Sequence, residues 1–238
     1  MDPTPEPIPE PTPRTAIIGP AVRTWLGHAA PLTALSAIAL SPLVAVALRT
    51  RAPVDAAGAR SAIGLGWTLL AVAWLGQLVL VGAAAAVMRA QGSGLGALAA
   101  FGAGAAQLAR AALPCLVAAL AVAIGGLALA VPAPVLLVLL ALTGASRERG
   151  LPAPLLDSIA AARRQLPAVA LAVAALLAID AAIGAVAHRA LIAPLARQPT
   201  PAQLAAARDF VRAIAIALVA ISPLPACVLA RLRARVEP

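Results

Sequence analysis

Groups that carry out chemistry are scarce in this chain of 238 residues, which has no lysine, no tyrosine, two histidines, two cysteines and nine acidic residues. Cys115 and Cys227 lie inside apolar stretches, with no second cysteine or histidine at ligand spacing. This argues against a disulfide framework or a metal site and favours two small core residues. His28 and His188 stand apart from any serine, cysteine or carboxylate pattern typical of a catalytic triad. We therefore expect no catalytic residue, no metal and no cofactor, and a protein that is not an enzyme.

Aromatic side chains are also few, at 2% of the chain, although the net charge is +9. Nucleic-acid binding needs basic side chains on one water-exposed face with aromatic residues among them. Here all 18 basic residues are arginines, and nearly all of them stand in short gaps between long apolar runs. Arginines in such gaps are typical of the inside-positive bias of membrane proteins and of binding to anionic lipid headgroups. We expect the lipid bilayer, and no nucleic acid, as the partner of these arginines.

Long apolar runs dominate the rest of the sequence, which is 62% hydrophobic and 11% charged. Its mean hydropathy of +0.96 exceeds what a surface facing water tolerates. A bilayer core of about 30 Å needs about 20 apolar residues per helix. Runs without charge or with almost none cover 29–48, 62–88, 112–145, 166–187 and 210–230. The composition predicts an all-α fold, a polytopic transmembrane helical bundle.

The first residues differ from the remainder of the chain. Residues 1–20 are rich in proline, with acidic residues among the prolines, and we expect a disordered tail, with a docking peptide for a partner as the alternative. An acidic, proline-rich start is the opposite of a cleaved signal peptide. Residues 21–238 then form a single transmembrane helical domain.

The run 112–145 decides the number of spans. As one helix its 34 residues would extend about 50 Å, too long for a single crossing. Gly125-Gly126 and the prolines at 132 and 134 offer places to break it into a hairpin. We therefore predict six spans, arranged as three hairpins: 29–48, 62–88, 111–126, 130–146, 166–187 and 208–231.

The arginines give the orientation. Six spans place eleven arginines on the side of both termini and seven on the other, which favours cytoplasmic termini. A five-span alternative, in which 112–145 crosses once and the amino terminus is outside, gives ten against eight. The absence of lysine beside abundant alanine, proline and arginine fits a GC-rich bacterial genome. We expect a multi-pass protein of the bacterial cytoplasmic (inner) membrane. The eleven arginines are Arg14, Arg23, Arg89, Arg110, Arg147, Arg149, Arg163, Arg164, Arg231, Arg233 and Arg235.

An internal repeat supports six spans. The segments 110–114 (RAALP) and 163–167 (RRQLP) each follow a helix rich in small residues and precede an apolar span. Before the first, Leu98, Phe101, Ala105 and Leu108 share one helical face; before the second, Leu155, Ile159, Ala162 and Leu166 do so, with Asp157 and Arg164 away from it. A looser third copy covers 22–31. We expect interfacial amphipathic helices on the cytoplasmic leaflet, each followed by a proline and a hairpin.

From these segments the chain resembles a family. The turn 91–94 (QGSG), the helix to Arg110 and Leu113-Pro114, the hairpin, and then 155–167 look like bacterial six-helix YciC-type integral membrane proteins. They are similar as well to the membrane domain attached to some glycerophosphodiester phosphodiesterases. The resemblance covers 60–190 and implies an envelope role. It does not imply phosphodiesterase activity, which belongs to a separate soluble domain whose acidic and histidine metal ligands this chain lacks.

One acidic residue, Asp180, lies well inside a predicted span, away from its ends. A carboxylate in the bilayer costs several kcal/mol, which makes Asp180 the candidate intramembrane functional residue. A structural role is the first interpretation, either as an ion pair with His188, Arg189 or Arg212 or as a protonated, hydrogen-bonded carboxyl group. A proton or cation relay is the alternative.

Other features indicate how the helices pack. Gln77, in the middle of the second span, predicts a hydrogen bond to a neighbouring helix. Alanines at 170, 174, 178 and 182 form a small-residue stripe for close packing within the chain or between subunits. Ser41-Pro42 and Ser222-Pro223 predict bends in the first and last spans.

Together these features predict a non-enzymatic integral membrane protein that acts as a scaffold or accessory subunit. Its partner is a membrane protein or a second copy of the chain. The alternative is a transporter or channel component with Asp180 in a proton or ion pathway.

Overall fold

The computed structural model describes residues 18–49, 56–128, 132–148, 150–187 and 200–236. Most of the predicted tail, 1–20, therefore lies outside the described residues. The part of the chain that is described forms helices and no strands, which confirms the predicted all-α class. The helices are α1 (Ile18–Gly27), α2 (Ala29–Ala39), α3 (Ser41–Arg49), α4 (Ala56–Gly92), α5 (Ala97–Ala128), α6 (Pro132–Leu140), the 3₁₀ turn η2 (Thr143–Ala145), α7 (Ala153–Arg164), α8 (Leu166–Ala187), α10 (Pro201–Ile221) and α11 (Pro223–Ala234).

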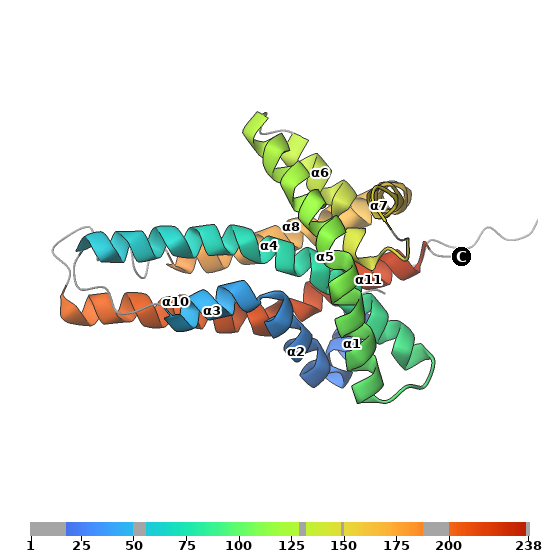
Figure 1. Ribbon diagram of the computed structural model, residues 1–238, viewed down its shortest axis with the longest axis horizontal. Coiled ribbons are helices and arrows are strands. Elements are labelled where there is room, and N and C mark those ends of the chain that lie inside the picture. Colours follow the sequence, from blue (N-terminus) through green and yellow to red (C-terminus); the bar gives the residue numbers. More distant parts are fainter. Residues whose placement is uncertain (1–17, 50–55, 129–131, 149, 188–199, 237–238) are drawn as a thin grey trace, which may run out of the picture.

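The helices run in two main directions (Figure 1). Helices α3, α8 and α10 and the first part of α4 lie along the long axis of the molecule. Helix α5 runs across this axis, with α6 beside its carboxyl-terminal part. At one end of the long axis α1 packs against α11, and α2 packs against α4 and α5.

Within the described residues, four helical segments are long and apolar enough to cross a membrane: 73–92 in α4, 97–125 in α5, 166–183 in α8, and 212–234 across α10 and α11. A fifth is added if α2 and α3, which meet at an angle of 72°, form one broken span. The predicted span 130–146 contains α6, and its apolar helical stretch Ala133–Ala145 is shorter than the others. The described residues thus have the apolar helices of a membrane protein, and the count of six spans stays a prediction.

Both predicted Ser-Pro breaks are present. Helix α2 ends at Ala39 and α3 begins at Ser41, and α10 ends at Ile221 with α11 beginning at Pro223. The Leu-Pro entry at 166–167 also separates α7 from α8. Proline cannot donate the helical hydrogen bond and its ring crowds the preceding turn, so each of these sites favours an interruption.

The predicted interfacial helix before Arg110 is wrong as a separate element. Helix α5 is continuous for 32 residues, with Pro114 inside it. Its first half packs against other helices, because Gly104 lies so close to α2 that a Cβ there would be 2.5 Å from a methyl carbon of Leu35. A proline inside a membrane helix is tolerated where neighbouring helices and small backbone adjustments satisfy the freed carbonyl group.

The apolar face predicted for the first half of α5 is mostly turned toward other helices. Leu108 is buried and Phe101 and Ala105 are partly buried, whereas Leu98 is 85% exposed. In lipid, small residues allow helix backbones to approach, while large apolar side chains are equally well placed against acyl chains. On the apolar face predicted for α7, Ala162 is buried, Leu155 and Ile159 are partly buried, and Leu166 is exposed.

The closest backbone contact joins α4 to η2. A Cβ atom at Gly82 would overlap the carbonyl oxygen of Gly144, and one at Gly144 would overlap the carbonyl oxygen of Leu78. Because the neighbouring atoms belong to the backbone, no rotation of a side chain can make room. Glycine at both positions therefore sets the distance between α4 and the segment after α6.

We expect Gly82→Ala to lower the stability of the purified protein in detergent by about 1–3 kcal/mol, the usual cost of forcing an extra methyl group into a packed site. The measurement is thermal unfolding followed by circular dichroism. Gly102→Ala is the matched control, since nothing lies within 4 Å of the position of its Cβ atom. The control should be neutral or stabilising by up to about 1 kcal/mol, the helix propensity of alanine over glycine. Equal melting temperatures for the two variants would contradict the close contact.

Candidate functional site

Asp180 lies on the buried face of α8, which also carries Val169, Val173 and Leu176, and the residue is 8% exposed. Two side chains of α4, Trp74 and Gln77, approach its carboxyl group as hydrogen-bond donors. The Gln77 amide nitrogen also donates to the Ser222 hydroxyl oxygen at the start of α11, over 3.3 Å. Polar side chains from three helices thus meet between α4, α8 and α11.

A small cavity of about 20 Å³ adjoins this cluster, with Trp74, Gln77, Leu176 and Ser222 in its wall. That volume is enough for about one water molecule. One carboxyl oxygen of Asp180 and the amide oxygen of Gln77 have no hydrogen-bond partner among the described residues. The cluster therefore has acceptor capacity that a single water molecule or a proton on Asp180 would satisfy.

Of the three predicted partners of Asp180, the described residues include only Arg212. Arg212 donates to the backbone oxygen of Ala47 on α3, over 3.4 Å, and His188 and Arg189 lie outside the described residues. The groups seen beside Asp180 are neutral donors, so the predicted hydrogen-bonded carboxyl group fits the described residues better than the ion pair. The predicted interhelical bond of Gln77 is confirmed. No spacing in the sequence indicated that Trp74 and Gln77 would lie beside Asp180, or that Ser222 would bind Gln77.

The predicted alanine stripe faces outward. Ala174, Ala178 and Ala182 are exposed and Ala170 is partly buried, because α8 turns its valine and leucine face inward. The part of the prediction that placed the stripe at a contact within the chain is wrong, and a contact between subunits stays a prediction.

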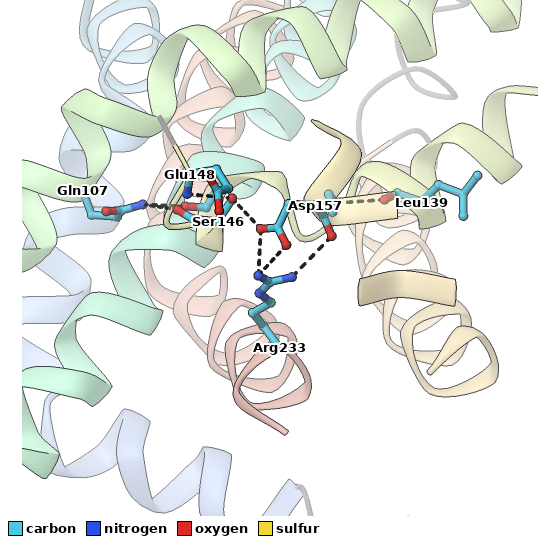
Figure 2. A network of polar contacts seen from close by, with 8 residues as sticks. Gln107, Leu139, Ser146, Glu148, Asp157 and Arg233 are labelled. Atoms are coloured by element: carbon cyan, nitrogen blue, oxygen red, sulfur yellow. Dashed lines mark hydrogen bonds and ion pairs between the residues drawn. The ribbon is translucent and has the colours of Figure 1, made fainter. Parts of the chain in front are cut away.

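A second polar cluster lies at the end of the molecule that carries Arg89, Arg110, Arg147, Arg231 and Arg233, here called the arginine-rich end (Figure 2). Arg233 on α11 donates two hydrogen bonds to the Asp157 carboxylate on α7, at 2.8 and 2.7 Å. The Ser146 hydroxyl donates to the same carboxylate, at 2.5 Å. The Gln107 amide on α5 donates to the backbone oxygens of Gly144 and Ser146, at 3.0 and 3.3 Å. This network ties α5, α7 and α11 to the segment after α6.

Arg233 was among the arginines expected on the cytoplasmic side, and Asp157 was placed away from the apolar face of its helix. The Arg233 side chain is only 9% exposed and that of Asp157 only 25%, so the two side chains are largely taken up by each other. One terminal nitrogen of Arg233 donates to both carboxylate oxygens, and this charge-assisted pair offsets the cost of removing both charges from water. The sequence shows both residues but not their contact, because they are 76 positions apart.

The first helix joins the same end. Arg231 on α11 donates to the Thr24 hydroxyl oxygen on α1, at 2.6 Å, and Thr24 donates to the backbone oxygen of Pro20. Several stretches of the chain thus meet here: α1, the first half of α5, residues 144–148, α7 and α11. The sequence repeat related only residues that are close together in the chain, so it did not predict these contacts between distant stretches.

Two larger cavities open at this end, of about 630 and 490 Å³. The first is lined by Arg89, Arg110 and Arg147, and the second by Arg89, Arg231 and Arg233. Arg89 therefore stands between the two. Each cavity has room for a small-molecule group, and the concentration of guanidinium groups favours an anion.

Comparison of the chain with protein-family models, with curated proteins and with solved structures gave no match. The described residues also contain no group of three or more histidine, cysteine or acidic side chains placed to hold a metal ion. What the two polar clusters do is therefore inferred from their own geometry.

Proposed function

We propose that this chain is a non-enzymatic integral membrane protein of the bacterial inner membrane that acts as a scaffold or accessory subunit. The observation that carries this proposal is the packing between the spans. Where α4, α8 and α11 enclose a polar cluster, the space amounts to about 20 Å³, room for one water molecule rather than a solute. Two larger cavities among the described residues, of about 630 and 490 Å³, lie at the arginine-rich end. The resemblance to YciC-type membrane proteins agrees with this assignment.

The outward face of α8 supports an accessory role. Ala174, Ala178 and Ala182 are exposed at four-residue spacing, and small residues allow a second helix to approach closely in lipid. The proposed partner is another membrane protein or a second copy of the chain.

Affinity purification of the full chain from membranes in mild detergent tests this role. We expect a stoichiometric partner with the wild-type chain and about tenfold less of it with Ala178→Leu, since a loss of about 1.4 kcal/mol from overpacking corresponds to that factor. Ala213→Leu, an exposed alanine on α10, is the control and should keep the partner. A wild-type chain that elutes alone, as a monomer, would rule out the accessory role.

We further propose six spans with both termini in the cytoplasm. Three contacts support this topology: Thr24 with Arg231, Gln107 with Ser146, and Asp157 with Arg233. Six spans put all of these residues on the cytoplasmic side of the membrane. The other arginines of that side then lie at the level of anionic headgroups. The five-span alternative separates Thr24 from Arg231, and Gln107 from Ser146, by the whole bilayer.

Cysteine labelling in intact cells tests the topology. With six spans, Thr50→Cys reacts with a membrane-impermeant maleimide from outside, and Leu151→Cys reacts only after the cells are opened. Five spans predict that both are protected until opening. The wild-type chain is the control, because Cys115 and Cys227 are buried at 0% exposure and should stay unlabelled.

The polar cluster around Asp180 favours a second candidate function, a transporter or channel component. A buried carboxyl group with a neighbouring one-water cavity has two of the elements of a proton relay. Proton movement would need further polar groups leading to each face of the membrane.

Proteoliposomes distinguish the two functions. The vesicles contain a pH dye, and a potassium diffusion potential is imposed across their membrane. Because the scaffold has no proton pathway, we expect vesicles with the wild-type chain or with Asp180→Asn to acidify at the same rate as empty vesicles. Asparagine retains the hydrogen bonding of a structural carboxyl group, so the variant keeps the contacts of Asp180. Asp209→Asn, exposed in α10, controls for the loss of a carboxylate elsewhere. Proton flux that is present in wild type and in Asp209→Asn but absent in Asp180→Asn would replace the scaffold by the transporter.

A further inference from the structure

The larger cavity at the arginine-rich end is lined by three guanidinium groups against one carboxylate. Its walls come from α4, α5, η2 and the segment after η2. The polar side chains that line it are Arg89, Arg110, Arg147, Gln107, Thr143, Ser146 and Glu148. The Thr143 hydroxyl is buried and has no hydrogen-bond partner among the described residues. A phosphate group is the anion best suited to a cavity lined by three arginines, since each guanidinium donates in a fork that matches its oxygens.

An apolar ridge begins beside this cavity. Pro114 of α5 is part of the cavity wall, and the adjacent Leu113 is 59% exposed. Leu116, Leu120 and Ile124 continue the same face at helical spacing, and all three are exposed. From residue 113 to residue 124 the ridge extends about 16 Å along α5. That length matches one leaflet of the hydrocarbon core, about 15 Å.

Cavity and ridge together have the shape and chemistry of one lipid molecule. We propose that the cavity binds the headgroup phosphate of an anionic glycerophospholipid, whose acyl chains lie along Leu113, Leu116, Leu120 and Ile124. The inference rests on the proposed membrane topology, which puts the cavity at the cytoplasmic headgroup level. It goes beyond a general attraction of arginines to anionic lipid, because it names one site and its lining residues.

Charge selects the class of lipid. A zwitterionic headgroup brings an ammonium group close to the three arginines, and only Glu148 offsets that repulsion. An anionic headgroup such as phosphatidylglycerol carries no cation. The site therefore prefers anionic to zwitterionic phospholipid.

Native mass spectrometry of the full chain in non-ionic detergent tests this site. The delipidated protein is titrated with dioleoylphosphatidylglycerol or with dioleoylphosphatidylethanolamine, and the one-lipid complex is counted. We expect phosphatidylglycerol to bind about tenfold more tightly than phosphatidylethanolamine. The double variant Arg110→Gln/Arg147→Gln should lose about tenfold or more in phosphatidylglycerol affinity, since each arginine near anionic lipid contributes about 1 kcal/mol.

The matched control is Arg163→Gln/Arg164→Gln. It removes the same charge from the end of α7, where both arginines are exposed and outside the cavity lining. The control should keep phosphatidylglycerol affinity within about twofold, well under the 1.4 kcal/mol of a tenfold change. An equal loss in both double variants would mean diffuse surface attraction and would overturn the site. Arg110→Gln alone, an exposed helical position, replaces the double variant if that does not fold.

A soluble phosphate ester carries the same phosphate group as the lipid and is the other occupant to test. If sn-glycerol 3-phosphate displaces phosphatidylglycerol at similar concentrations, the occupant is a soluble phosphate and the lipid assignment fails. Extraction of membranes with sodium carbonate keeps this result separate from the proposed function. A chain released without detergent overturns the membrane function itself, whereas a chain that stays in the membrane without headgroup selectivity overturns only the lipid site.

Discussion

Where α4 passes η2, the carbonyl oxygen of Gly144 occupies the space that a side chain at residue 82 would fill. Helices in lipid gain little from hiding apolar surface from one another, because acyl chains are as apolar as leucine. Close backbone approach and hydrogen bonds must hold them instead. The contacts of Gly104 with Leu35 and of Gly76 with Leu40 and Ala39 follow the same rule. The position of the segment that carries Ser146 and Arg147 depends on this constraint.

The polar groups divide between two environments. Between the spans, Asp180 meets the neutral side chains of Trp74 and Gln77, and the residual space holds about one water molecule. At the arginine-rich end, an ion pair between Arg233 and Asp157 is combined with cavities lined by further arginines. The first environment favours a fixed, structural carboxyl group, and the second favours the binding of an anion. The proposed scaffold role and the proposed lipid site thus rest on different parts of one fold.

Sequence patterns predicted the local features of this fold. Apolar runs predicted helices, and the Ser-Pro pairs and the Leu166-Pro167 pair predicted the breaks after Ala39, Ile221 and Arg164, because both signals depend on neighbouring residues only. The break predicted at Leu113-Pro114 is wrong, since α5 continues through Pro114. A proline inside a membrane helix is tolerated where neighbouring helices satisfy the freed carbonyl group, and those neighbours come from distant parts of the chain. The neighbours of Asp180 and of Arg233 could not be predicted, because they depend on how helices far apart in the chain are arranged.

The hydrogen bond between Arg231 and Thr24 joins residues that are 207 positions apart. A ribosome adding about 5–20 residues per second needs about 10–40 s to make the intervening chain. During that time the earlier helices can already be inserted, while Thr24 still waits for its donor. The arginine-rich end is therefore the last part of the fold to close during synthesis, and a chain truncated before α11 would leave Asp157 without the cation that balances its charge.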